Sequence, residues 1–292
     1  MAALLETRGL TKVYGTFRAL DSLDLAVAPG EIVGLLGPNG SGKTTSLRLA
    51  LGFLKPTSGT ATVGGFDSWK QSVEVRKLLT YLPGELRLYE TMTGRQLVTF
   101  LGKLRGDTVG KEVDDLAKRL DIDPDKPLVQ MSSGMKRKVA LLAVLVPKVP
   151  LIILDEPTNT LDPTMRDEFL LQLKWAKDNG KAILFSSHVL HEVEAVCDRV
   201  VILRQGKLVH HQVMSELADA RRITCTLTGP APTRCPMGET IPAAAVEGNL
   251  LDLEYRGPLP KLLHWLGELK LADLRIEPLG LCKIYRFHHC NG

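Results

Sequence analysis

The segment Gly37–Thr45 has the residue types and the spacing of a phosphate-binding loop. Its sequence, GPNGSGKTT, matches the pattern GxxxxGK followed by Ser or Thr, between a predicted strand and a predicted helix. Glycines let the backbone curl around an anion, and a helix N-terminus adds a favourable dipole. We expect Lys43 to reach the β- and γ-phosphates of a nucleotide and the Thr44 hydroxyl to bind Mg²⁺. The expected nucleotide contacts are Gly37, Pro38, Asn39, Gly40, Ser41, Gly42, Lys43, Thr44 and Thr45.

Two carboxylates follow an apolar run further along the chain. Leu151–Pro157 reads LIILDEP, a predicted buried strand that ends in Asp155 and Glu156. Such a strand carries both acids to the phosphate-binding edge of a parallel sheet. We expect Asp155 to hold Mg²⁺, directly or through water, and Glu156 to orient and deprotonate the attacking water. The simpler alternative is that the paired acids only cap the N-terminus of a helix.

Short apolar runs separated by helical stretches indicate the scaffold for these residues. Ile32–Leu36 reads as a buried strand before the glycine-rich loop, and Lys43–Gly52 has helical periodicity after it. Further strands are predicted at Leu78–Pro83, Leu151–Glu156, Ala182–His188 and Arg199–Leu203. Continuous apolar strands that alternate with helices favour an α/β fold, with a parallel sheet covered on both faces. The region 85–147 lacks such strands, and we interpret it as a helical subdomain.

The sequence pattern changes after residue 219. Ile223–Thr228, Asn249–Tyr255 and Leu274–Pro278 alternate between apolar and polar residues, and leucines between residues 259 and 269 fall at helical spacing. We therefore predict two domains. Residues 1–219 form the nucleotide-binding domain, which opens with an alternating strand at Leu23–Val27, and residues 220–292 form a small α+β accessory domain.

Composition and charge bound the class of protein. The chain has 292 residues, of which 44% are apolar and 24% charged, as expected for a globular protein with one large and one small domain. The net charge of +4 is spread along the chain. We interpret the short basic cluster Lys136, Arg137 and Lys138 as solvated surface charge and expect no nucleic-acid partner.

The apolar stretches are too short for a membrane span. The longest, Val139–Val146, ends at Pro147 and is far below the roughly 20 residues that a bilayer requires. Glu6 and Arg8 interrupt the N-terminal apolar residues too early for a secretory signal. The expected compartment is the cytoplasm.

The cysteines show no paired spacing. The five cysteines, Cys197, Cys225, Cys235, Cys282 and Cys290, include no CxxC pair, so reduced thiols are expected. His288, His289 and Cys290 are side chains that can bind metals, but they lie at the very C-terminus, where we do not expect a metal site.

Together these motifs resemble the nucleotide-binding subunit of ATP-binding cassette (ABC) transporters, over Leu4 to about Ala218. Met131–Lys138, MSSGMKRK, is similar to the LSGGQ signature, and Asn159–Asp162 is similar to the loop that crosses the dimer interface. The resemblance implies that Tyr14 stacks on adenine, that Asp162 belongs to the nucleotide site, and that His188 is the switch histidine. A buried core tyrosine and a structural histidine are the simpler alternatives.

The signature resemblance also implies a dimer. In the family, the serine and glycine of the signature meet the γ-phosphate bound to the opposing subunit, and here Ser132 and Gly134 hold those positions. Ser133 replaces the first glycine, and Met135 replaces the glutamine. We expect these departures to change affinity without abolishing function. The second subunit can be identical or merely related.

A larger departure lies after the strand at residues 78–83. The family usually has a glutamine directly after this proline, but the chain has Gly84, and Glu85 is the nearest polar residue that could substitute. This variation, the phrase LKPTSG and the tail LRIEPLGLCKIYRF resemble the ABC-2-type exporter branch. The tail likeness is loose, since Leu281, Cys282 and Lys283 replace acidic residues.

The resemblance implies ATP-driven closure of two cassettes, hydrolysis and reopening that drives a permease on a separate chain, at the cytoplasmic face of the membrane. The segment Leu86–Met92 is the expected coupling site, with Leu86, Leu88 and Tyr89 as the apolar surface of a groove for a permease helix. The simpler alternative is that Leu88 and Tyr89 only pack the helical region against the sheet. An importer ATPase is the first alternative. A non-transport ABC protein is the second, and the single cassette and the lack of sustained heptads argue against it.

Overall fold

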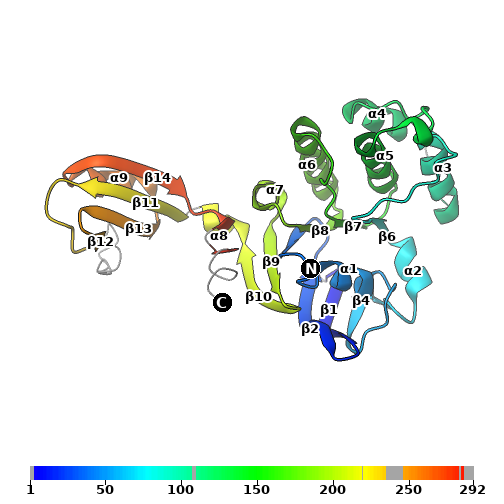
Figure 1. The fold of residues 1–292 in the computed structure, drawn as a ribbon, viewed down its shortest axis with the longest axis horizontal. Coiled ribbons are helices and arrows are strands. Elements are labelled where there is room, and N and C mark those ends of the chain that lie inside the picture. Colours follow the sequence, from blue (N-terminus) through cyan, green and yellow to red (C-terminus); the bar gives the residue numbers. More distant parts are fainter. Residues whose placement is uncertain (1–2, 107–109, 219, 235–245, 283, 286–292) are drawn as a thin grey trace. The chain divides into compact units, whose positions relative to one another are not determined.

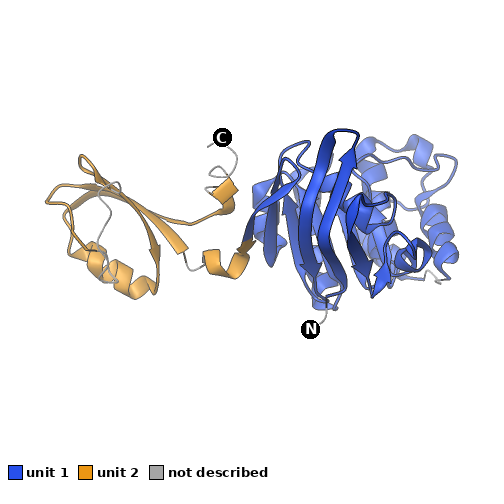
Figure 2. Cartoon of the chain, turned by 90° about the horizontal axis from the view of Figure 1, so that it is seen from below, with its two compact units in different colours: residues 1–211 blue, residues 212–292 orange. Residues whose placement is uncertain are grey.

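The computed structural model describes residues 3–106, 110–218, 220–234, 246–282 and 284–285. The chain divides into two compact units, Met1–His211 and Gln212–Gly292 (Figure 2). This division falls a few residues before the predicted domain boundary at 219, which stays a prediction. The described residues do not include Cys235, Lys283 or His288–Cys290, the segment where no metal site is expected.

The larger unit is built on a six-stranded sheet with the order β10-β9-β3-β8-β7-β6 (Figure 1). The strands are β3 (Ile32–Leu36), β6 (Leu79–Leu82), β7 (Leu151–Asp155), β8 (Ala182–Ser187), β9 (Arg199–Arg204) and β10 (Lys207–Val213). Strands β6, β7, β8, β3 and β9 pair in parallel. The predicted α/β fold with a parallel core sheet is confirmed.

Both faces of this sheet are covered, which explains the continuous apolar runs. On β7, Leu151 and Ile153 pack in one apolar cluster with α1 (Lys43–Ala50). Ile152 and Leu154 point to the opposite face and are also fully buried. Helices α6 (Pro163–Asp178) and α7 (Leu190–Val196) contact β8. A strand buried on both faces has no polar alternation, so its sequence reads as an unbroken apolar segment.

A second, antiparallel sheet has the order β2-β1-β4-β5. Its strands are β1 (Leu5–Tyr14), β2 (Phe17–Val27), β4 (Ser58–Val63) and β5 (Phe66–Asp67), and α2 (Ser72–Lys77) follows them. The predicted strand Leu23–Val27 is only the end of β2, and β1 was not predicted. Register shifts between Thr7 and Val13 explain why β1 was not predicted, because each shift breaks the alternation of apolar residues that marks a strand.

The helical subdomain lies within the predicted region 85–147. It contains α3 (Gly94–Arg105), α4 (Glu112–Arg119), the 3₁₀ turn Leu128–Gln130 and α5 (Ser133–Leu145). Figure 1 shows these helices grouped near β6 and β7. Thr93 starts α3 with a capping box to Gln96. A small apolar core formed by Leu97, Leu128, Met131 and Val139 joins α3, the 3₁₀ turn and α5.

The smaller unit has the order β12-β13-β11-β14 with one helix packed on the sheet. Its elements are α8 (Met214–Ala218), β11 (Ala220–Leu227), β12 (Val246–Glu247), β13 (Leu250–Arg256), α9 (Leu259–Gly267) and β14 (Leu271–Pro278). Ile223 and Leu251 of the sheet pack against Leu262 and Leu266 of α9. This arrangement matches the predicted α+β accessory domain.

Two further observations concern the described residues of the whole chain. No helix among them is both long enough and apolar enough to cross a bilayer. The described cysteines are free thiols, of which Cys197 and Cys225 are buried and Cys282 is exposed. Burial raises the pKa of the Cys197 and Cys225 thiols, which keeps them protonated and unreactive.

Candidate active site

The glycine-rich loop connects β3 to α1 and can be formed only with glycine at two positions. Gly42 has φ 105°, and an added Cβ would lie 2.7 Å from the Ala19 carbonyl oxygen. A Cβ at Gly37 would lie 2.5 Å from the Leu203 carbonyl oxygen. Backbone packing this close explains why the pattern requires these glycines.

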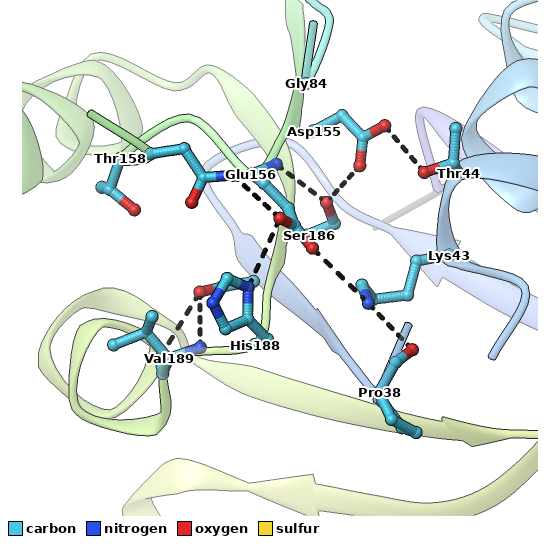
Figure 3. Close-up of polar contacts among 12 residues, drawn as sticks. Pro38, Lys43, Thr44, Gly84, Asp155, Glu156, Thr158, Ser186, His188 and Val189 are labelled. Carbon is cyan, nitrogen blue, oxygen red and sulfur yellow. Dashed lines mark hydrogen bonds and ion pairs between the residues drawn. The ribbon is translucent and has the colours of Figure 1, made fainter. Parts of the chain in front are cut away.

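Lys43 is buried at the start of α1 and lies between the loop and an acidic strand end. Its side-chain nitrogen donates to the carbonyl oxygens of Gly37 at 2.7 Å and Pro38 at 3.2 Å. It also lies 3.6 Å from Glu156 Oε1 (Figure 3). Burial lowers the pKa of Lys43, and the charges of Glu156 and Asp155 oppose this shift. The loop therefore holds a buried cation next to backbone amides, as an anion site requires.

Asp155, at the end of β7, faces the hydroxyl of Thr44. Thr44 Oγ1 donates to Asp155 Oδ2 at 2.9 Å, and Ser186 Oγ donates to Asp155 Oδ1 at 2.6 Å (Figure 3). A hydroxyl and a carboxylate oxygen that converge in this way are hard ligands of the kind Mg²⁺ prefers. The donor set therefore fits the predicted metal. The Ser41 Oγ in the adjacent loop is buried and has no hydrogen-bond partner among the described residues.

Glu156 adopts an uncommon backbone conformation that turns its side chain into the site. Its φ is 45°, and its amide nitrogen donates to the Ser186 carbonyl oxygen at 3.1 Å. Glu156 Oε2 accepts from Asn159 Nδ2 at 2.9 Å and lies 3.4 Å from His188 Nδ1 (Figure 3). A non-glycine residue held at positive φ is strained, and such strain is concentrated at functional sites.

The environment of Glu156 keeps its carboxylate ionised. Burial raises its pKa, but the Asn159 hydrogen bond and the charges of His188 and Lys43 outweigh this effect and hold the pKa below its usual value. An ionised carboxylate at neutral pH can accept a hydrogen bond from a water molecule. Sequence analysis named Glu156, His188 and Lys43 separately, and the structure brings all three side chains together.

Sequence analysis missed a buried arginine at this site. The basic cluster at residues 136–138 is predicted to be solvated surface charge. For Arg137 this prediction is wrong, because only 2% of its surface is exposed. The guanidinium donates to the carbonyl oxygens of Pro157 at 2.8 Å, Gly84 at 3.0 Å and Pro83 at 3.1 Å, and also to that of Glu156. Arg137 thus ties the signature helix α5 to the Gly84 segment and to the backbone of Glu156.

Arg137→Met is expected to destabilise the protein by about 1–3 kcal/mol, because buried carbonyl groups lose their donor. Burial lowers the pKa of Arg137 to about 10, so the guanidinium is charged at neutral pH. Denaturant unfolding measures the effect. Lys138→Met is the matched control, since within the described part of the chain Lys138 donates only to the Asp121 carbonyl oxygen, at the surface. Equal midpoints for both variants would contradict a structural role for Arg137.

A second missed residue is Glu192 on α7, which is fully buried. Its Oε2 accepts from Thr158 Oγ1 at 2.8 Å and from Ser187 Oγ at 3.1 Å. Arg166 Nε lies 3.0 Å from the Oε1 atom. The carboxylate therefore connects the loop after Glu156 with the strand end before His188. A single sequence carries no signal for this, because a glutamate in a helix is usually solvated.

The structure does not bring the remaining predicted residues to the glycine-rich loop. Ser132 caps α5 by accepting from the Met135 amide, and Asp162 caps α6 by accepting from the Met165 amide. Tyr14, the last residue of β1, is exposed, with the Lys12 ammonium 5.0 Å from its ring centroid. The hydrogen bonds and ion pairs found among the described residues do not link Ser132, Asp162 or Tyr14 to the loop.

Gly84 and Glu85 differ in their position relative to the site. A Cβ at Gly84 would lie 3.8 Å from Asp155 Oδ2, so this segment borders the carboxylate. Glu85 is exposed and makes no hydrogen bond to the site within the described part of the chain. The predicted substitution of Glu85 for the missing glutamine therefore has no supporting contact.

Comparisons with known proteins agree with this geometry. Residues 20–159 match the family described as ABC transporter. The ABC transporter ATP-binding protein NatA of Bacillus subtilis is 36% identical, over 70% of this chain and 86% of that protein. The daunorubicin/doxorubicin resistance ATP-binding protein DrrA of Streptomyces peucetius is 33% identical, over 73% of this chain and 66% of that protein.

The fold comparison gives the same family. A structure described as an ATP-binding subunit of an ABC transporter is 28% identical and aligns with a TM-score of 0.69. The alignment covers 73% of this chain and 91% of that one, so it spans nearly a whole cassette. The chain belongs to the ATP-binding subunits of ABC transporters, and it is an ATPase of that family.

Proposed function

We propose that this chain hydrolyses ATP at the interface of two such subunits and thereby powers an ABC-2-type exporter. One observation carries the proposal: the Glu156 carboxylate lies between Lys43, Asn159 and His188. This places an ionised acceptor for a water proton beside the cation of a phosphate-binding loop. Relatives named for resistance, such as the daunorubicin/doxorubicin protein, support export as the direction.

In this proposal each side chain has one task. The loop amides and Lys43 bind the phosphates of ATP and stabilise the charge that develops on them. Glu156 accepts a proton from the attacking water. His188, whose Nδ1 faces the Glu156 carboxylate, orients that carboxylate. Thr44 and Asp155 would hold Mg²⁺, which neutralises phosphate charge when it is bound.

The second subunit, identical or related, would complete the site. Ser132 and Gly134 lie at the N-terminus of α5, where backbone amides can meet an anion. A Cβ at Gly134 would lie 3.3 Å from the Thr160 carbonyl oxygen, so the signature borders the exposed loop Asn159–Asp162. This surface suits a contact with the nucleotide of the partner subunit.

Ser132→Arg in one half of a tandem-linked dimer is expected to lower hydrolysis about 100-fold at the site whose Lys43 belongs to the other half. Glu156→Gln in one half silences the site formed by the Lys43 of that half, so phosphate release reports hydrolysis at the other site. When Glu156→Gln and Ser132→Arg are in the same half, the site that is still active uses the Lys43 of the unaltered half and the altered signature, and its hydrolysis should fail. In the opposite arrangement hydrolysis should be normal, and the reverse pattern would reject a trans site.

A permease on a separate chain would hold this subunit at the cytoplasmic face of the membrane. In the predicted coupling segment, Leu88 is half-buried and packs against the apolar core of the helical subdomain. Tyr89 is 60% exposed and packs edge-on against Phe100, with 6.1 Å between the two ring centroids. Leu104, further along α3, is 69% exposed. These side chains give α3 and the segment before it an exposed apolar surface that suits a permease helix.

The double change Tyr89→Ala and Phe100→Ala is expected to weaken capture of the permease at least about tenfold, because exposed aromatic residues dominate such interfaces. Folding and basal ATPase activity should persist, since neither side chain is buried. Copurification of the tagged subunit with its permease gives the measurement. Leu171→Ala, on the exposed face of α6, is the control and should not change capture. Full capture by the double variant would place the coupling surface elsewhere.

A further inference from the structure

The smaller unit has a long sheet edge at β14. Among the described residues, β14 pairs with β11 on one side and ends the strand order β12-β13-β11-β14. It spans eight residues, Leu271–Pro278, and Leu274 in its middle is 39% exposed. Proteins usually shorten or block such edges, because unpaired backbone groups can pair with another strand.

The register shows which backbone groups of β14 point outward. Leu279 N donates to the Ala220 carbonyl oxygen at 2.8 Å, which fixes the phase of the ladder with β11. Asp273 and Arg275 then form hydrogen-bonded pairs with β11, and the groups of Leu274 and Ile276 face away from it. Consistently, Leu274 N donates to the Asp273 side chain at 2.9 Å instead of to a strand.

The sequence of this edge is complementary to itself. Asp273, Leu274 and Arg275 follow one another, and the charged side chains at both ends are exposed. In an antiparallel pair with two-fold symmetry about Leu274, Asp273 of each strand lies opposite Arg275 of the other. The outward N–H of each Leu274 then donates to the outward carbonyl oxygen of Leu274 in the other strand. Symmetry about Ile276 is worse, because it sets Leu274 opposite Pro278, which has no N–H.

We propose that β14 is a pairing strand for a second copy of this chain, joined antiparallel about Leu274 to give a continuous sheet across the two smaller units. The contact would be small, and it gains strength when the two copies are already held together elsewhere. It goes beyond the proposed ATPase function and needs neither nucleotide nor permease.

Cysteine cross-linking of the full chain without nucleotide tests the register. Cys225 lies opposite Leu274 on β11 and would compete within the chain, so the background changes it to alanine and changes Cys235, Cys282 and Cys290 to serine. In this background Leu274→Cys should form disulfide-linked dimers. Opposed hydrogen-bonded residues lie about 5.5 Å apart at Cα, within disulfide range. Ala272→Cys is the matched control and should stay monomeric, since residue 272 faces residue 276 of the second copy. Equal cross-linking of both variants, or of neither, would overturn the proposal.

A charge swap tests the ion pairs by a separate measurement. Arg275→Asp sets like charges opposite each other twice and should weaken self-association of the nucleotide-free chain about tenfold at low salt. Adding Asp273→Arg to the same chain restores opposite charges and should return association to within about twofold of the original. Sedimentation equilibrium gives both values. If the double variant associates no better than the single one, the two residues do not face each other, and the proposed pairing is wrong.

Discussion

Glu156→Gln is expected to lower ATP turnover by about 10²–10⁴-fold while ATP binding remains intact. The amide keeps the size and much of the hydrogen bonding of the carboxylate but cannot accept a proton from water. Lys43 and Thr44, which are expected to hold the phosphates and the metal, are unchanged. ATP should therefore bind and remain uncleaved, and the ATP-bound dimer should accumulate. Phosphate release and size-exclusion chromatography with ATP measure the two effects.

Glu85→Gln is the matched control for this experiment. It makes the same chemical change at an exposed carboxylate for which the described residues show no hydrogen bond to the site. Turnover of the control should equal that of the unaltered protein. A Glu156→Gln variant that hydrolyses ATP at a similar rate would show that another group accepts the proton. Reduced turnover in the control alone would move that role to Glu85.

Lys43→Ala is expected to weaken ATP binding about 10–100-fold, because it removes a charged donor to the β- and γ-phosphates. The loss differs in kind from that of Glu156→Gln, since here the bound state itself is destabilised. Titration with a fluorescent ATP analogue gives the affinity. Hydrolysis should fall with it, because less nucleotide is held beside Glu156.

The control for Lys43→Ala is Lys77→Ala, which removes an exposed lysine paired with Glu74. Its affinity for ATP should be unchanged. Thermal unfolding of both variants is needed, because Lys43 also donates to the Gly37 and Pro38 carbonyl oxygens and supports the loop itself. A folded Lys43→Ala variant with unchanged affinity would mean that the nucleotide lies elsewhere.

Local sequence was sufficient for the parts of this protein that are contiguous. The glycine-rich loop needs only its own residues and the flanking strand and helix, so its pattern predicts it directly. Leu151–Asp155 is buried on both faces, so its apolar run alone predicts a core strand. By contrast, β1 carries register shifts that hide its alternation, and sequence analysis did not find it.

Tertiary structure decided which of the candidate residues meet and which are buried. Thr44 and Asp155 lie 111 residues apart and are joined only because β3 and β7 end at the same edge of one sheet. Arg137 belongs to a basic cluster that looks solvated, yet it is buried because two separate segments, Pro83–Gly84 and Glu156–Pro157, direct carbonyl oxygens at it. Burial depends on what packs over a residue, and that depends on contacts between distant segments that no local pattern records.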